Sequence, residues 1–256
     1  MKRSIVEGLI EWKILINYKV ELGVLQRFLP QPFFPRSIRG FGLVGIAVTK
    51  QKGLRSVGVP LSVGFSSMIV EHQIAASWEN AGKLCHGLYI PRRDTSSLLQ
   101  MMVGDRLSGG MHHLSRIRAR IRYDRYTLGM RSIDQQGVKV QLMAKLTDRF
   151  PMGSVMKELE TAVDFFESGK IAYSPLYKKS VFEGIAWQAK DYSIQPLRVE
   201  RLNGNYWEEL AGFPAKSVFF DHALLIQGAP HQWNHIPELI APRPYELSNN
   251  KVLLEK

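Results

Sequence analysis

The chain of 256 residues carries 34 Lys and Arg against 23 Asp and Glu, a formal net charge of +11 at pH 7. Hydrophobic residues make up 45% and charged residues 22%, a globular composition that excludes a disordered or collagen-like chain. The single cysteine, Cys85, excludes an intramolecular disulfide and with it a secreted disulfide scaffold.

The first half of the chain predicts strands, because apolar residues alternate with polar ones. We expect strands over residues 10–18, 40–49, 69–78 and 84–90. A short helix over 21–29 is expected to end at a group of prolines. The longest uncharged run, 56–70, is shorter than the roughly 20 apolar residues of a spanning helix. We therefore predict a cytoplasmic protein with no membrane partner.

The second half predicts a meander, one helix and further strands. Segments 116–122, 126–132 and 138–146 follow one another, and the first and last alternate strictly. A helical period over 155–166 has Ser154 as a candidate N-cap and Gly169 as a candidate C′ residue. Strands are expected over 181–202 and 217–227, and an irregular tail from about 237. Together these elements predict a single, mainly β, α+β domain over 1–256, built on a large antiparallel sheet or barrel.

The first candidate site is the segment 89–97. A strand is expected to end near Ile90, Pro91 to turn the chain, and a short helix to follow over 97–103. Two guanidinium groups beside a helix N-terminus favour a carboxylate or phosphate. Alternatively, Asp94 pairs with one arginine and caps the helix. The predicted substrate-binding residues are Arg92, Arg93, Asp94, Thr95 and Ser96.

Glu71, His112 and His113 are the candidate acid or base residues. Neighbours on a strand point to opposite faces, so only one of Glu71 and His72, and one of His112 and His113, can face an interior. A surface glutamate and loop histidines without function are the alternatives. No further ligands lie at metal-binding spacing, so no metal is expected.

Three other features carry weaker signals. His231 and His235 have the i, i+4 spacing of metal ligands on a helix, but nearby prolines leave room for little more than one turn. The alternation at 116–122 places four arginines, Arg116, Arg118, Arg120 and Arg122, on one face of a strand. A solvated face is the default interpretation of this stripe. No nucleotide-binding glycine motif follows a strand, and no cofactor is expected.

Several segments together resemble the YqjF-like family of the acetoacetate decarboxylase-like superfamily. They are residues 14–18, 25–30, 89–97, 110–113, 173–175, 221–225 and 231–233, of which Arg92-Arg93-Asp94-Thr95-Ser96-Ser97 and His112-His113 are the most specific. The resemblance covers most of the chain from about residue 10 to 235. It implies a large, bent antiparallel sheet that closes into a cone-like barrel around a pocket, with a few short helices.

The resemblance also implies a difference in chemistry. Acetoacetate decarboxylases use a Schiff-base lysine within a Pro-Lys-Lys segment, where this chain has Pro91-Arg92-Arg93. A guanidinium stays protonated and is no amine nucleophile, so imine chemistry is not expected from this position. Glu71 resembles one acidic residue of the decarboxylase pocket, whereas an arginine of the first strand falls at Glu11, which is a mismatch.

Three functions remain open from the sequence. The first is a barrel that binds a small organic anion, either without turnover or as a lyase or isomerase without a Schiff base. The second is a decarboxylase-type enzyme that uses a lysine elsewhere in the chain. The third, less favoured, is a nucleic-acid-associated protein that uses the arginine stripe, whose strand lacks the interleaved aromatic residues typical of single-strand binding. A homo-oligomer is possible in each case.

Overall fold

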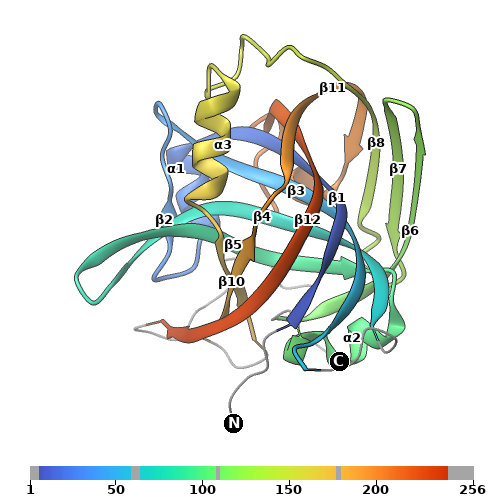
Figure 1. Ribbon diagram of the computed structural model, residues 1–256. Helices are drawn as coiled ribbons and strands as arrows, with labels where there is room; N and C mark the ends of the chain where they lie inside the picture. The colour runs from blue at the N-terminus through green and yellow to red at the C-terminus, as the bar shows by residue number, and fades with distance from the viewer. Residues whose placement is uncertain (1–5, 59–63, 108–109, 177–179, 242–256) are drawn as a thin grey trace.

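The computed structural model describes residues 6–58, 64–107, 110–176 and 180–241 (Figure 1). The tail beyond 241 lies outside the described residues. The short helices are α1 (Leu22–Leu25), continued by a 3-10 turn over Gln26–Phe28, α2 (Leu98–Leu107), α3 (Leu159–Glu167) and a π-helical turn over Tyr206–Leu210. None of the helices in this part of the chain is long and apolar enough to span a membrane.

Strands make up most of the described chain, which confirms the mainly β prediction. They are β1 (Val6–Glu21), β2 (Phe34–Pro35), β3 (Phe41–Ser56), β4 (Phe65–Asn80), β5 (Lys83–Thr95), β6 (His112–Arg122), β7 (Arg125–Ser132), β8 (Lys139–Leu146), β9 (Ile171–Pro175), β10 (Val181–Ala189), β11 (Ser193–Gly204) and β12 (Phe219–Ile240). Within the described residues they form one sheet, and the expected meander β6–β7–β8 is present.

The sheet closes on itself twice. The first ring runs through β1, β3, β4, β5, β6, β7, β8, β11 and β12. The second ring shares β12, β1, β3, β4 and β5 but closes through β9 and β10. The large sheet that the sequence predicts is present, and it is mixed, because the pairings β5–β6 and β5–β9 are parallel. Each follows a crossover that contains a helix, α2 or α3, as parallel pairing requires.

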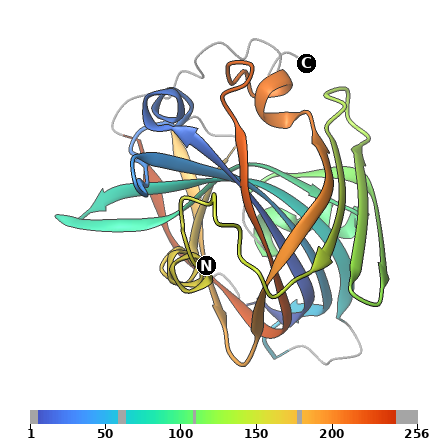
Figure 2. The same ribbon diagram turned by 90° about the horizontal axis from the view of Figure 1, so that it is seen from above.

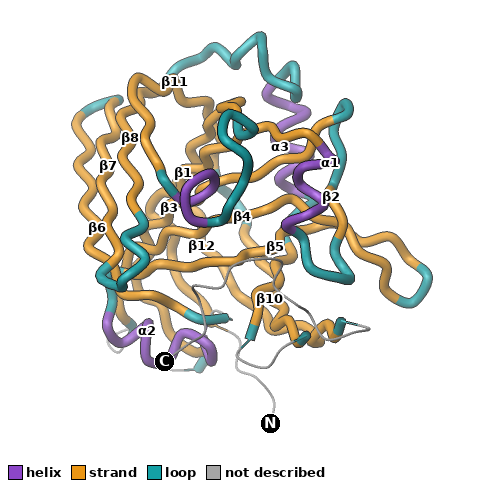
Figure 3. The backbone as a smooth tube through the Cα atoms, turned by 180° about the vertical axis from the view of Figure 1, so that it is seen from behind, coloured by secondary structure: helices purple, strands orange, loops and turns teal. Residues whose placement is uncertain are grey.

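The alternation of β1 explains how one set of strands serves two rings. Trp12, Ile14 and Ile16 belong to an apolar core with residues of β6, β7, β8 and β11, inside the first ring. Leu15 points the other way, into a core that includes Trp187 of β10 and residues of α3. Successive strand residues alternate between faces, so the even and odd positions of β1 line different rings. Figures 2 and 3 show α3 on the side of the molecule away from β6 and β7.

Several predicted boundaries are wrong for local physical reasons. β5 does not end at Ile90 but continues to Thr95, because an irregularity in its pairing with β4 accommodates Pro91. The predicted helix over 155–166 begins only at Leu159, and Ser154 is not its cap. The hydroxyl of Ser154 instead donates to Asp221 of β12 at 2.5 Å. Gly169 does follow the C-cap residue Ser168, as predicted. β12 continues to Ile240, past the expected start of the irregular tail.

Candidate functional site

Neighbouring residues of β4 and β5 point to opposite faces and build two separate polar clusters. Glu71 and Arg93 face the second ring, whereas Arg92 lies on the face of the first ring. The strand geometry predicted this separation for Glu71 and His72. For Arg92 and Arg93 the sequence did not predict this separation, because a turn rather than a continuing strand was expected at Pro91. The paired guanidinium clamp expected from Arg92 and Arg93 is therefore divided between the two clusters.

The cluster facing the second ring, hereafter the Lys13 cluster, comprises Lys13, Glu71, Arg93 and His112. Arg93 is 2% exposed, and its Nε donates to Oε1 of Glu71 at 2.8 Å. Nη1 of Arg93 also donates to Oγ of Ser174 on β9. The second oxygen of Glu71 accepts a hydrogen bond of 3.0 Å from Gln73. Burying a charged group costs free energy unless it is paired and hydrogen-bonded. The ion pair between Glu71 and Arg93, with its additional hydrogen bonds, offsets that cost.

Lys13 of β1 is the residue of this cluster that sequence reasoning missed. Its side chain is 5% exposed, and among the described residues it forms no salt bridge or hydrogen bond. Its Nζ lies 5.7 Å from the ring centroid of Trp187 on β10. Burial lowers the pKa of Lys13, the nearby charge of Arg93 lowers it further, and the charge of Glu71 partly opposes both. The outcome is an ammonium group that loses its proton more readily than an ordinary lysine.

Burial acts on the other members of the cluster in different directions. Burial alone would raise the pKa of Glu71, but the charges of Arg93 and Lys13 lower it below its ordinary value. Glu71 is therefore a carboxylate at neutral pH. Burial and the charge of Arg93 lower the pKa of His112 to about 3, so this imidazole is neutral. Nδ1 of His112 lies 3.1 Å from the carbonyl oxygen of Gly110 and donates to it, which places the lone pair on Nε2.

Glu183 of β10 adds a second buried carboxylate on the same side. Its Oε2 accepts a hydrogen bond of 2.9 Å from the backbone N–H of Gly110, and its Oε1 lies 3.4 Å from Nδ1 of His235. His231 and His235 both lie in β12 rather than on a helix, so the helical spacing considered for them does not apply. Burial lowers the pKa of His231 to about 4, to which the charge of Lys13 also contributes.

A surface groove adjoins the Lys13 cluster. Its volume is about 930 Å³, and its lining includes Trp187 and His231 together with the cations Lys52, Arg55, Lys170 and Lys190. Glu7 is the carboxylate in this lining, and it pairs with Arg55 at 2.6 Å. Trp187 therefore contributes both to the lining of the groove and to the surroundings of Lys13, whereas the four residues of the Lys13 cluster do not line the groove themselves.

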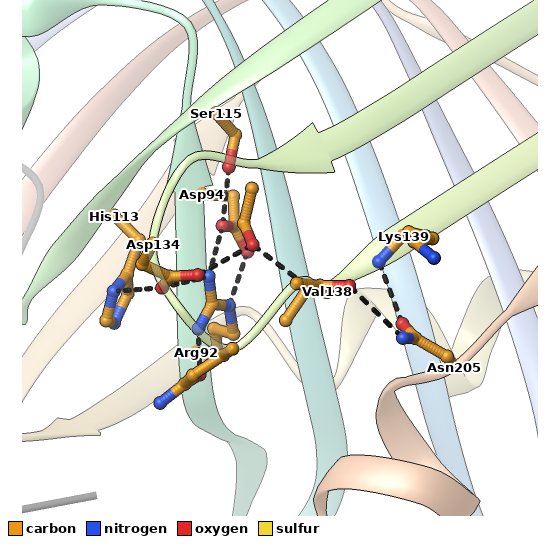
Figure 4. Close-up of polar contacts among 11 residues, drawn as sticks. Arg92, Asp94, His113, Ser115, Asp134, Val138, Lys139 and Asn205 are labelled. Carbon is orange, nitrogen blue, oxygen red and sulfur yellow. Dashed lines mark hydrogen bonds and ion pairs between the residues drawn. The ribbon is translucent and has the colours of Figure 1, made fainter.

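Arg92 anchors the second cluster, hereafter the Arg92 cluster, on the opposite face of β5 (Figure 4). Its Nε and Nη2 donate to both oxygens of Asp94 at 2.8 and 2.7 Å, and Nη2 also donates to Asp134 at 2.8 Å. Asp94 accepts a further bond of 2.7 Å from Ser115 of β6. Burial would lower the pKa of Arg92, but its carboxylate partners raise it. These bonds join β5 to β6 and to the β7–β8 turn.

The remaining predicted site residues lie apart from the Lys13 cluster. His113 contacts Asp134 at 3.0 Å, and His72 packs against the rings of Tyr206 and Trp207. The hydroxyl of Ser96 accepts a bond from the backbone of Met68, and that of Thr95 donates to Gln100. Ser97 caps α2, accepting from the N–H of Gln100 at 3.2 Å. The described residues hold no group of three or more His, Cys, Asp or Glu suited to a metal ion.

The fold resembles solved structures of acetoacetate decarboxylase-like enzymes. One such enzyme, from Sphingomonas wittichii RW1, is 12% identical with a TM-score of 0.60 over 94% of this chain and 95% of its own. Acetoacetate decarboxylase from Legionella pneumophila is 9% identical with a TM-score of 0.56, covering 94% and 88%. The enduracididine biosynthesis enzyme MppR, complexed with pyruvate, is 12% identical with a TM-score of 0.52, covering 92% and 91%.

These likenesses define the class of fold, a closed, mainly β barrel of the acetoacetate decarboxylase-like type. No protein-family model matches the chain, and no curated protein matches it. The YqjF-like assignment therefore remains a prediction from the sequence segments quoted above.

Proposed function

We propose that this protein binds a small organic anion with a reactive carbonyl group, such as an oxo acid, and that Lys13 forms an imine with it. The observation that carries the proposal is the state of Lys13, a buried amine without an ion-pair partner among the described residues and with a lowered pKa. A neutral amine is the nucleophile in imine formation, and burial next to another cation is the environment that produces one. The lysine is thus on β1 rather than in the segment 91–93.

The other members of the Lys13 cluster have matching roles. The positive charges of Arg93 and of the groove favour an anionic substrate. Attack by Nζ on the carbonyl carbon forms a C–N bond, and loss of water gives a protonated imine that withdraws electrons from the neighbouring carbon. Glu71 can accept a proton near this centre, because it is a carboxylate at neutral pH and its charge acts on Lys13. His112, with its pKa lowered to about 3, stays neutral and is a poor base. The neighbours support this substrate class, since one is described as complexed with pyruvate.

Borohydride trapping tests the proposal. The protein is incubated with pyruvate or acetoacetate at neutral pH, reduced with borohydride and mapped by peptide mass spectrometry. We expect a reduced adduct on Lys13 and none in Lys13→Met. The matched control is Lys50→Met, on the neighbouring β3, whose amine is partly exposed and paired with Glu11 at 3.3 Å. This control should keep the Lys13 adduct.

Two other results separate the parts of the proposal. A shift in melting temperature with oxo acids, but no adduct on Lys13, would leave a binding protein without covalent chemistry. An ordinary lysine reacts slowly because it is protonated at neutral pH. Adducts spread equally over the exposed lysines would therefore show that Lys13 has no special reactivity.

A further inference from the structure

The outer face of the first ring is strongly and almost uniformly basic. On the adjacent strands β7, β8 and β11, cations alternate with core residues that fill the ring, and on β6 they alternate with Ile117 of the core and then with the exposed Ala119 and Ile121. We call this surface the arginine face; it consists of Arg116, Arg118, Arg120, Arg122, Arg125, Arg131, Lys139, Lys145, Arg198 and Arg201. All are exposed except the half-buried Lys145. Glu200 is the carboxylate on these four described strands, and it lies 3.5 Å from both Arg125 and Arg198.

The strand register places like charges directly opposite one another. Arg116 pairs with Arg131, and Arg131 with Lys139. At the other end of the hairpins, Arg125 lies opposite both Arg122 and Lys145. Like charges directly opposite on neighbouring strands destabilise a sheet. This arrangement costs stability in the isolated protein, and a bound polyanion would offset that cost.

We propose that the arginine face binds the phosphodiester backbone of a nucleic acid. Arginines two residues apart on β6 lie about 6.8 Å from one another, and neighbouring strands are about 4.8 Å apart. The face is therefore a grid of cations with a spacing comparable to that of consecutive phosphates. Guanidinium groups bind phosphate oxygens through two parallel hydrogen bonds, and most of these cations are arginines.

The composition of the face favours a duplex over the other polyanions. Its outward positions on β7 and β8 between the cations are Thr127, Gly129, Gln141 and Met143, which offer no aromatic platform for unstacked bases. Met143 is the one large apolar side chain among these four, less than the continuous apolar face with which a protein inserts into a membrane surface. A groove of about 1210 Å³ borders the face and includes Arg116, Arg118, Arg131, Lys139 and Arg201, with Glu208 and Glu209 also in its lining. The face stands at the end of the molecule opposite the tip of the β4–β5 hairpin (Figures 1 and 3).

Fluorescence anisotropy with a labelled mixed-sequence DNA duplex of about 20 bp tests the proposal over about 50 to 200 mM NaCl. We expect affinity to fall with salt, with a logarithmic slope of about −0.9 for each phosphate contacted and at least four contacts. In the double variant Arg118→Gln/Arg120→Gln the slope should become shallower by about 1.8, and the affinity at low salt should fall by about tenfold or more.

The matched control is Lys83→Gln/Lys157→Gln, which removes the same charge from exposed positions outside the four strands. The control should keep the slope of the unmodified protein. Equal losses in both double variants would overturn the proposal, because the attraction would then be one of net charge alone. Binding weaker than millimolar at low salt would overturn it as well. So would sedimentation with phosphatidylserine vesicles in the absence of duplex binding. None of these outcomes depends on Lys13, so this test and the trapping test fail separately.

Discussion

Whether the side chain of Lys13 is exposed or buried depends on the strand that packs over it. In the sequence Lys13 is one of the polar residues that alternate with apolar ones on a predicted half-buried strand, where a lysine is expected to face water. In the structure the polar face of β1 is covered by β10, whose Trp187 lies over the amine. The same alternation that predicts the strand therefore places a lysine inside the molecule.

At the residue scale, the buried pair of Glu71 and Arg93 gives a prediction about stability. Glu71→Gln should destabilise the protein by about 3 kcal/mol at pH 7, because it leaves the charge of Arg93 buried without its carboxylate. Chemical denaturation measures the effect. Glu79→Gln is the control, since Glu79 is exposed on the same strand.

The effect of Glu71→Gln should depend on pH in one direction. The pKa of Glu71 is lowered in the folded state, so its carboxylate contributes stability above its unfolded pKa of about 4.3 and loses it as pH falls through the folded value. The difference in stability between the two proteins should shrink in melts recorded below about pH 4. A difference that grows with acidity would contradict the ion pair.

At the scale of elements, the Arg92 cluster holds the second half of β5 against β6 and the β7–β8 turn. Its arginine donates to two carboxylates and a glutamine, and Asp94 is fully buried. Breaking one partner of such a network leaves the others uncompensated. We therefore predict that Arg92 stabilises the assembly of the first ring.

Arg92→Met should lower the free energy of unfolding by about 3–5 kcal/mol, as measured by chemical denaturation, because it leaves the carboxylates of Asp94 and Asp134 without their cation. Arg92→Lys should lose less, since it keeps the charge but not the paired hydrogen bonds. Imine trapping at Lys13 should persist in both variants wherever they remain folded. A loss of oxo-acid binding with unchanged stability would instead support the clamp that the sequence predicts.

At the scale of the whole molecule, the positive charge is unevenly distributed. Much of it lies on the arginine face, and a smaller group borders the groove beside Trp187. The two surfaces belong to different rings that share a set of strands. The two proposed partners, a small anion and a nucleic acid, would therefore bind to separate surfaces.

The arginine face predicts a salt effect on stability without any partner. Raising NaCl from about 20 to about 300 mM should increase the melting temperature by a few degrees, because it screens the like charges opposite one another on β6, β7 and β8. The increase should be smaller in Arg116→Gln/Arg131→Gln, which removes charges from the opposed pairs, than in Lys83→Gln/Lys157→Gln. A melting temperature that falls with salt would show that attractive pairs dominate.

The strands, the meander and the exposed arginine stripe could all be predicted from the amino-acid sequence. These depend on local alternation, which neighbouring residues impose through the geometry of an extended chain. Its predictions were wrong where long-range contacts decide, as at Pro91, where pairing with β4 carries β5 past the proline. The resemblance of its motifs to acetoacetate decarboxylases also indicated the barrel, which the fold confirms.

Which residues form a site depends on long-range contacts in the folded molecule. Lys13, Glu71 and Arg93 come from three strands of the second ring, and His112 joins them from the start of β6, where it pairs with Arg93. The continuation of β5 past Pro91 separates Arg92 from Arg93, although they are adjacent in the chain. Burial and the distance between charges determine which groups carry a proton, and neither is a property of local sequence. The net charge was readable from composition, whereas its division between a binding groove and an outer face depends on how the sheet closes.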